Sequence, residues 1–183
     1  MVCRVYVVDE NDNVVSESTK REVHEKMEWH RVSHVLVFNR RGEILIHKRA
    51  SHKRMFPCLW DYIVGGHVEI GESYEEAAKR EVTEEIGVEA KGMKELLKTN
   101  GVIERNGQVN KEIVKIFAIV TELSVDDMTP EKKEISEMKF IPFSELEKIS
   151  KNEEEHEKFV SFLHLKKTIP GIRNFLKDFS LSA

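Results

Sequence analysis

The sequence predicts a domain that mixes α-helices and β-strands, of the α/β or α+β class. Two observations carry this prediction: short apolar runs bounded by turn residues, which are typical of buried strands, and a capped amphipathic helix over residues 74–86. The chain has 183 residues, of which 40% are hydrophobic and 34% are charged. A chain of this length can bury a substantial core, so we expect a single domain over residues 1–183.

The apolar runs are expected to form strands that pair as hairpins, because short connections favour antiparallel neighbours. The expected strands are residues 3–8 with the extended residues after the turn cluster 9–13, residues 32–38 with 43–49 across the turn 39–42, the segment after residue 89 with residues 112–120 across the turn signal at residues 105–107, and a last strand over residues 138–143. The second pair is too apolar to be half exposed, so we expect it to form a central hairpin of the sheet.

The predicted helix has a recognisable start and end. Ser73 and Glu76 have the spacing of a capping box, in which each side chain accepts a hydrogen bond from the backbone N–H of the other residue. Gly87 supplies the left-handed residue that commonly ends a helix. Apolar residues one turn apart form a stripe that is expected to face the core, namely Ala78, Val82 and Ile86.

Three glutamates share one edge of this helix. Glu81, Glu84 and Glu85 fall on a sector beside the apolar stripe. Like charges at these spacings destabilise a bare helix by about 0.2–0.5 kcal/mol per pair, so the cluster requires an explanation. One explanation is a solvated face, which is common in a chain rich in charge. The other is a hard divalent cation, because carboxylate oxygens suit Mg²⁺ or Mn²⁺.

A longer pattern around the glutamates favours the cation. With U for an apolar residue, the chain reads G-x5-E-x7-R-E-U-x-E-E-x-G-U from Gly66 to Val88. With average residue usage, these constraints are met by chance on the order of 10⁻⁹ times per register. At every fixed position the pattern resembles the signature of the Nudix hydrolases, and the flanking sequence extends the similarity over roughly residues 1–145.

The resemblance implies an α/β/α sandwich around a central mixed sheet, with residues 66–88 as a loop–helix–loop catalytic motif. It also implies a hydrolase that depends on Mg²⁺ or Mn²⁺, in which water attacks a diphosphate. The small-molecule substrate would be a nucleoside diphosphate linked to another moiety. The residues that the resemblance indicates are Glu81, Glu84 and Glu85 as metal ligands or as groups that orient the water, and Gly66, Glu72 and Arg80 as a structural brace.

Residues outside the motif are candidates for charge neutralisation and for proton transfer. A diphosphate with bound metal keeps excess negative charge, so Arg49 and Lys53, in a basic segment, are candidates for substrate binding. The alternative is a solvated loop. Glu112 opens an apolar strand, where it could act as a general base in place of Glu84 or Glu85. The alternative for Glu112 is an exposed strand end.

Residues 30–39, 48–57 and 65–68 resemble the Nudix branch that includes isopentenyl diphosphate isomerases. The positions that this branch uses are occupied here by His30, His67, Glu112, Arg49 and Lys53, and this adds His67 to the substrate-site candidates. The isomerase needs a cysteine just before its Gly-His pair, where this chain has Gly65, and it lacks the full set of motif carboxylates. We therefore expect a hydrolase, with an isomerase-like enzyme or a non-catalytic nucleotide sensor as alternatives.

His30 and His34 lie beside or within an apolar run. Each is either a metal ligand or a satisfied core or surface residue, and the sequence leaves both possibilities open.

Composition limits the partners. The net charge is −4, with 29 basic and 33 acidic residues intermixed, so there is no basic stripe for duplex nucleic acid. No apolar run approaches the about 18 residues of a membrane-spanning helix. Cys3 and Cys58 cannot form a disulfide framework, and no signal segment precedes them, so we expect a cytoplasmic protein.

The C-terminal residues, about 150–183, are expected to form a helical extension without chemistry. Helices are predicted over residues 152–165 and 172–179, separated by Pro170 and Gly171. The extension is expected to pack on the domain or to form the contact of a possible homodimer.

Overall fold

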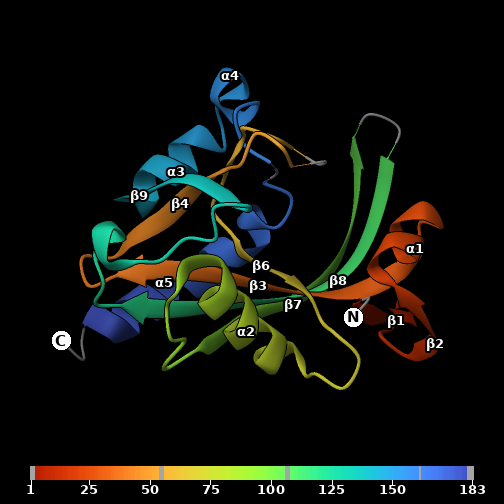
Figure 1. The fold of residues 1–183 in the computed structure, drawn as a ribbon. Coiled ribbons are helices and arrows are strands. Elements are labelled where there is room, and N and C mark those ends of the chain that lie inside the picture. Colours follow the sequence, from red (N-terminus) through yellow and green to blue (C-terminus); the bar gives the residue numbers. More distant parts are fainter. Residues whose placement is uncertain (1–2, 54–55, 106–107, 161, 181–183) are drawn as a thin grey trace.

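A computed structural model describes residues 3–53, 56–105, 108–160 and 162–180 (Figure 1). The elements in chain order are β1 (Arg4–Val8), β2 (Val14–Thr19), α1 (Lys20–Glu25), β3 (Trp29–Asn39), β4 (Glu43–Arg49), β5 (Trp60–Asp61), β6 (Val64–His67), α2 (Tyr74–Ile86), β7 (Lys94–Arg105), β8 (Gln108–Thr121), the 3-10 turn η1 (Val125–Asp127), β9 (Ile135–Pro142), α3 (Phe143–Ile149), α4 (Glu153–His156) and α5 (Leu165–Ser180).

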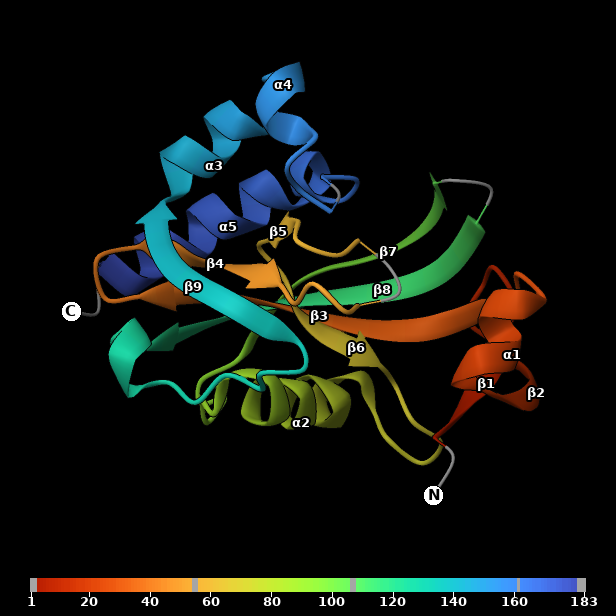
Figure 2. The ribbon, with the colours of Figure 1, turned by 45° about the horizontal axis from the view of Figure 1, so that its top comes forward.

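The strands form a mixed sheet centred on β3. β3 pairs in parallel with β8 along its whole length and antiparallel with β6, while β7 pairs antiparallel with the far side of β8. α2 lies on one side of the sheet, and α3, α4 and α5 lie on the other (Figure 2). This arrangement confirms the predicted mixed sheet between helical layers.

The side chains of β3 alternate between two cores, as the pleat of a strand requires. Val32, Leu36 and Phe38 belong to the core that α3 and α5 cover, whereas Val35 and Val37 belong to the core that α2 covers. Both cores are strongly apolar, which explains why the β3 sequence has no polar face.

Two of the predicted hairpins are confirmed. β1 and β2 pair antiparallel, and β7 and β8 pair antiparallel from Lys94↔Ala118 to Arg105↔Gln108. Residues 106 and 107, which carry the predicted turn, lie outside the described residues.

The predicted central hairpin is wrong in extent. Across the turn between them, β3 and β4 pair only at Phe38↔Ile44. β4 then leaves β3 and pairs with β9 and β5, so the sheet divides between these two groups of strands. The sheet can divide here because β3 and β4 each form backbone hydrogen bonds with other strands. The local sequence pattern does not indicate these partners.

The predicted helix over residues 152–165 is also wrong. α4 covers only Glu153–His156, and the chain then runs beside β5, where Trp60 N donates to Lys158 O at 2.8 Å and Val160 N donates to Trp60 O at 2.9 Å. These bonds continue the sheet edge and take the place of helical bonds.

The predicted break at Pro170 does not occur, because α5 runs through it. Proline removes one backbone donor from a helix. The apolar face of α5 offsets this cost, since Leu165 and Ile172 are fully buried against the sheet. In the part of the chain that the structure describes, no helix is both long and apolar enough to cross a membrane.

Candidate active site

The predicted catalytic helix forms as α2, with the predicted ends. Ser73 Oγ accepts from Glu76 N at 3.2 Å, and the Glu76 carboxylate accepts from Ser73 N at 2.8 Å. Gly87 ends the helix in the left-handed conformation with φ 69°. Its apolar stripe is fully buried, which fixes the direction in which the glutamate edge points.

Arg80 ties the preceding loop to α2. Its Nε and Nη2 donate to the two carboxylate oxygens of Glu72 at 2.7 and 2.9 Å, and Nη2 also donates to the His67 carbonyl at 3.0 Å. Its Nη1 donates to Glu81 Oε1 at 2.7 Å. The structure therefore brings the predicted Glu72 and Arg80 together, and the same guanidinium also orients a candidate metal ligand.

The motif carboxylates differ in exposure. Glu81 is 8% exposed and Glu85 is partly buried, whereas the Glu84 side chain is 61% exposed. Burial raises the pKa of Glu81. Burial also raises the pKa of Glu85 to about 8, and the negative charges of Glu81, Glu134 and Asp61 add to the rise. A divalent cation here would remove this repulsion, so the residues fit one.

Two further carboxylates face the same site from the sheet. Glu112 on β8 is 7% exposed, so the alternative of an exposed strand end is wrong. Burial raises its pKa to about 7, and Asn110 donates a hydrogen bond to it. Asp61 on β5 is 8% exposed and has a pKa raised to about 6 by burial. Asp61 has no spacing relation to the motif, so the sequence did not predict it.

A cavity of about 670 Å³ joins these groups. Of the predicted site residues, those that line it are Arg49, Lys53, Gly66, His67, Arg80, Glu81, Glu84, Glu85 and Glu112. Glu72 is not among the lining residues, and it contacts two of them, since its carboxylate accepts from Arg80 and from Glu69 N. Lys53 forms an ion pair with Glu134, which also lines the cavity, so a bound anion would have to compete with that carboxylate.

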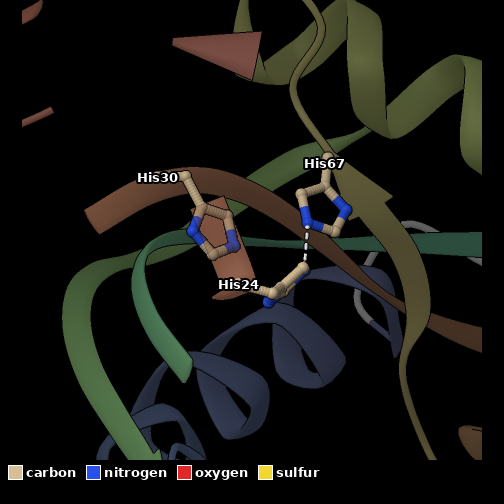
Figure 3. A group of neighbouring side chains, drawn as sticks. All are labelled: His24, His30 and His67. Carbon is tan, nitrogen blue, oxygen red and sulfur yellow. Dashed lines mark hydrogen bonds between the residues drawn. The ribbon is translucent and has the colours of Figure 1, made fainter. Parts of the chain in front are cut away.

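Three histidines form a second group of candidate metal ligands (Figure 3). His24, His30 and His67 come from α1, β3 and β6, and one nitrogen of each lies within 4.8 Å of the others. His24 Nε2 lies 3.0 Å from His67 Nε2. His24 falls in a charged segment without a periodic pattern, and the sequence did not predict it as a ligand.

The histidine trio has the chemistry of a transition-metal site. His30 Nδ1 lies 3.0 Å from the Glu28 carbonyl, an interaction that leaves Nε2 as the lone-pair donor, and this buried Nε2 has no partner among the described residues. Burial lowers the pKa of His30 to about 4 and that of His67 well below its usual value, so both rings are neutral. Neutral imidazoles suit Zn²⁺, Co²⁺ or Ni²⁺. His34 is not part of this trio.

A mixed sheet between helical layers, with carboxylates of a loop–helix–loop facing a cavity, defines the Nudix class of protein. The chain belongs to the Nudix family, since the NUDIX domain matches residues 27–163, and it is accordingly a Nudix hydrolase.

The chain is similar to three further proteins, two in sequence and one in fold. An uncharacterised Nudix hydrolase of Listeria monocytogenes is 32% identical over 66% of this chain and 68% of its own length. An isopentenyl-diphosphate Delta-isomerase of Photorhabdus laumondii is 37% identical over 44% of this chain and 46% of its own. The crystal structure of DR0079 from Deinococcus radiodurans has a TM-score of 0.65 at 24% identity, over 78% of this chain and 85% of that one.

The aligned parts cover from 45% to 75% of the length of the first six curated relatives. The isomerase relative confirms the predicted likeness to that branch.

Proposed function

We propose that this protein hydrolyses a diphosphate bond in a nucleoside diphosphate linked to another moiety, with Mg²⁺ or Mn²⁺ as cofactor. The observation that carries the proposal is the convergence of Glu81 and Glu85 from α2 and Glu112 from β8 on one cavity. Each is a carboxylate whose pKa is raised by burial, and such groups stay buried at neutral pH when a cation compensates them.

Glu81, Glu84 and Glu85 would hold the metal. When bound, the cation neutralises charge on the diphosphate and acts as a Lewis acid. Arg80 holds the Glu81 carboxylate in place through its 2.7 Å hydrogen bond. Gly66 lets the backbone of β6 lie directly against that carboxylate, because it has no side chain.

A carboxylate accepts the proton of the attacking water, and the candidates are Glu84, Glu85 and Glu112. A general base works best with a pKa near the working pH, and the value of about 7 for Glu112, which is not among the proposed metal ligands, meets this condition. The water oxygen forms a bond to phosphorus, the bridging P–O bond breaks, and the bridging oxygen leaves with the nucleotide or phosphate.

Arg49, Lys53 and His67 are the proposed contacts to the diphosphate. Arg49 and Lys53 carry permanent positive charge and line the cavity beside the carboxylates. The ion pair between Lys53 and Glu134 would exchange for one between Lys53 and a phosphate oxygen, which keeps the number of charge-assisted contacts constant.

An isomerase-like enzyme is the alternative that the likeness to the isomerase branch raises. Gly65 argues against it, because glycine cannot transfer a proton. Gly65 has a φ of +154°, and a Cβ at this position would lie 2.0 Å from the Ser33 carbonyl oxygen. The backbone therefore has no room for a cysteine side chain at position 65. A non-catalytic sensor is the other alternative, and the retained carboxylates argue against it.

The test is Mg²⁺-dependent release of phosphate or nucleotide from nucleotide sugars, dinucleoside polyphosphates, coenzymes and nucleoside triphosphates. Glu85→Gln should lower turnover by at least about 10²-fold, or about 2.7 kcal/mol of barrier, while the protein stays folded. Glu75→Gln on the same helix is the matched control, since Glu75 is exposed. Full activity of Glu85→Gln would contradict the assignment, and binding without turnover would favour the sensor.

A further inference from the structure

We propose that His34 and His164 determine specificity by hydrogen bonding to an uncharged polar group on the substrate moiety beyond the diphosphate. The group would be a hydroxyl, carbonyl or amine of a sugar or a base. The inference rests on the proposed function and names the substrate class of the same cavity. It starts from a histidine pair that belongs neither to the motif nor to the histidine trio.

His34 and His164 lie together at the side of the cavity that the C-terminal layer covers. Both line the cavity, and their ring centroids are 6.3 Å apart. On β3, His34 alternates with Ser33 and Val35 and so points to the face of Leu36, away from α2. The cavity therefore extends from the carboxylates of α2 through the divided sheet to this pair.

The pair carries polar atoms that lack partners. His164 is 4% exposed, and neither of its ring nitrogens has a hydrogen-bond partner among the described residues. The same is true of His34 Nδ1. Buried polar atoms are nearly always hydrogen-bonded in native proteins, because leaving them unpaired costs free energy. Unpaired ring nitrogens beside a cavity therefore indicate a ligand that pairs with them.

The surroundings indicate that the ligand group is uncharged. Val32, Ile103 and Val160 line the same cavity and leave this side apolar. Burial lowers the pKa of His34 to about 3 and that of His164 to about 4, so both rings are neutral at physiological pH. A neutral imidazole offers one donor and one acceptor, which match hydroxyl, carbonyl and amine groups.

Packing two residues before His164 and a close approach of β7 to its ring hold His164 in place. Tyr62 stacks on Phe162 with ring centroids 5.4 Å apart and an interplanar angle of 7°. A Cβ at Gly101, in the middle of β7, would lie 2.7 Å from His164 Cε1. A glycine inside a strand weakens the strand and often marks a close approach. Here the glycine makes room for the imidazole, so the position of His164 is part of the fold.

The test compares substrates that share a diphosphate and differ beyond it. UDP-glucose presents a sugar, diadenosine diphosphate a base, UDP-glucuronate a charged group, dimethylallyl diphosphate a hydrocarbon, and methyl diphosphate almost nothing. His164→Leu should lower kcat/KM at least about 10-fold for UDP-glucose, for diadenosine diphosphate or for both, and should leave methyl diphosphate unchanged. A loss confined to UDP-glucose would indicate a contact with the hexose or uracil, a loss confined to diadenosine diphosphate a contact with adenine, and a loss on both a contact with the shared ribose.

His164→Gln should retain most of the wild-type preference, because its amide also offers a donor and an acceptor. His164→Leu should fold and should not lower Tm, since it removes unpaired buried nitrogens from apolar surroundings. His52→Leu is the matched control, because His52 is exposed. His34→Leu should reproduce the selective loss.

An equal loss of kcat/KM on all five compounds would show a structural role and overturn the inference, as would no loss on any, or a wild-type preference for the charged or hydrocarbon substrate. If the wild type cleaves none of them, calorimetry with the same compounds and Mg²⁺ separates the two proposals. Binding of UDP-glucose or diadenosine diphosphate that weakens in His164→Leu would support the inference while the proposed hydrolysis fails. No binding of any compound would overturn both.

Discussion

Gly66 lies so close to Glu81 that a side chain at position 66 would collide with the carboxylate: an added Cβ would be 2.6 Å from Glu81 Oε1. Gly66→Ala should therefore displace Glu81 and lower kcat/KM at least about 10-fold, as a misplaced catalytic group does. Steady-state kinetics with varied Mg²⁺ check this.

Gly71→Ala is the control for Gly66→Ala. A Cβ at Gly71 meets nothing within 4 Å, although its φ is +91°. This variant should lose about 1 kcal/mol of folding free energy from backbone strain and keep its activity. Equal kinetics for the two alanine variants would contradict the steric explanation.

The paired hydrogen bonds of the Arg80 guanidinium predict that lysine cannot replace arginine at this position. Arg80→Lys keeps the charge but loses the paired bonds to Glu72 and the bond to the His67 carbonyl. We expect the free energy of unfolding to fall by about 1–3 kcal/mol. We also expect the apparent affinity for Mg²⁺ in the activity assay to be lower. Urea denaturation measures the first effect. A wild-type denaturation midpoint in Arg80→Lys would exclude the brace.

The buried carboxylates predict that the metal-free protein loses stability as pH rises above neutrality. Burial raises the pKa of Glu112 to about 7 and of Glu85 to about 8, so the native state binds more protons than the unfolded chain, and the free energy of unfolding falls with pH up to these values. Below about pH 7.5, where histidines of the unfolded chain bind protons, the lowered pKa values of the buried or partly buried histidines oppose this trend, namely those of His30, His34, His47, His67 and His164.

The pH window in which the carboxylates dominate is therefore about pH 7.5–8.5. With a chelator present, Tm should fall across this window, and Mg²⁺ or Mn²⁺ should restore it more strongly at the upper end. Glu85→Gln should flatten the fall, because it removes the carboxylate with the highest pKa of the set. A Tm that rises across the window would contradict the assignment.

The histidine trio predicts binding of a late first-row metal. Co²⁺ should give visible absorption bands when it is bound by His24, His30 and His67, and His30→Ala should abolish them. His52→Ala, at an exposed histidine, should leave them intact. Unchanged bands in His30→Ala would show that Co²⁺ binds elsewhere.

The local parts of the site could be predicted from the sequence. α2 has the predicted bounds because Ser73 and Gly87 act on neighbouring residues, and a capping box or a left-handed glycine needs nothing from the rest of the fold. The contact between Glu72 and Arg80 is implied by the resemblance to the Nudix signature, and the structure shows it.

The parts that depend on distant partners could not be predicted. β4 pairs with β9. The turn signal between β3 and β4 does not predict this pairing. Asp61, His24 and His164 reach the site through tertiary packing, and no spacing links them to the motif. The low helix propensity of proline also leads to a wrong prediction of a break at Pro170, since the burial of α5 outweighs one missing backbone donor.

The NUDIX domain match ends at residue 163, and His164 directly follows it. His164, which lines the cavity, therefore belongs to a segment outside the matched domain. Relatives with a different segment here could keep the same catalytic carboxylates and act on different substrates. Evolution of selectivity in such enzymes would then require no change in the residues that perform the reaction.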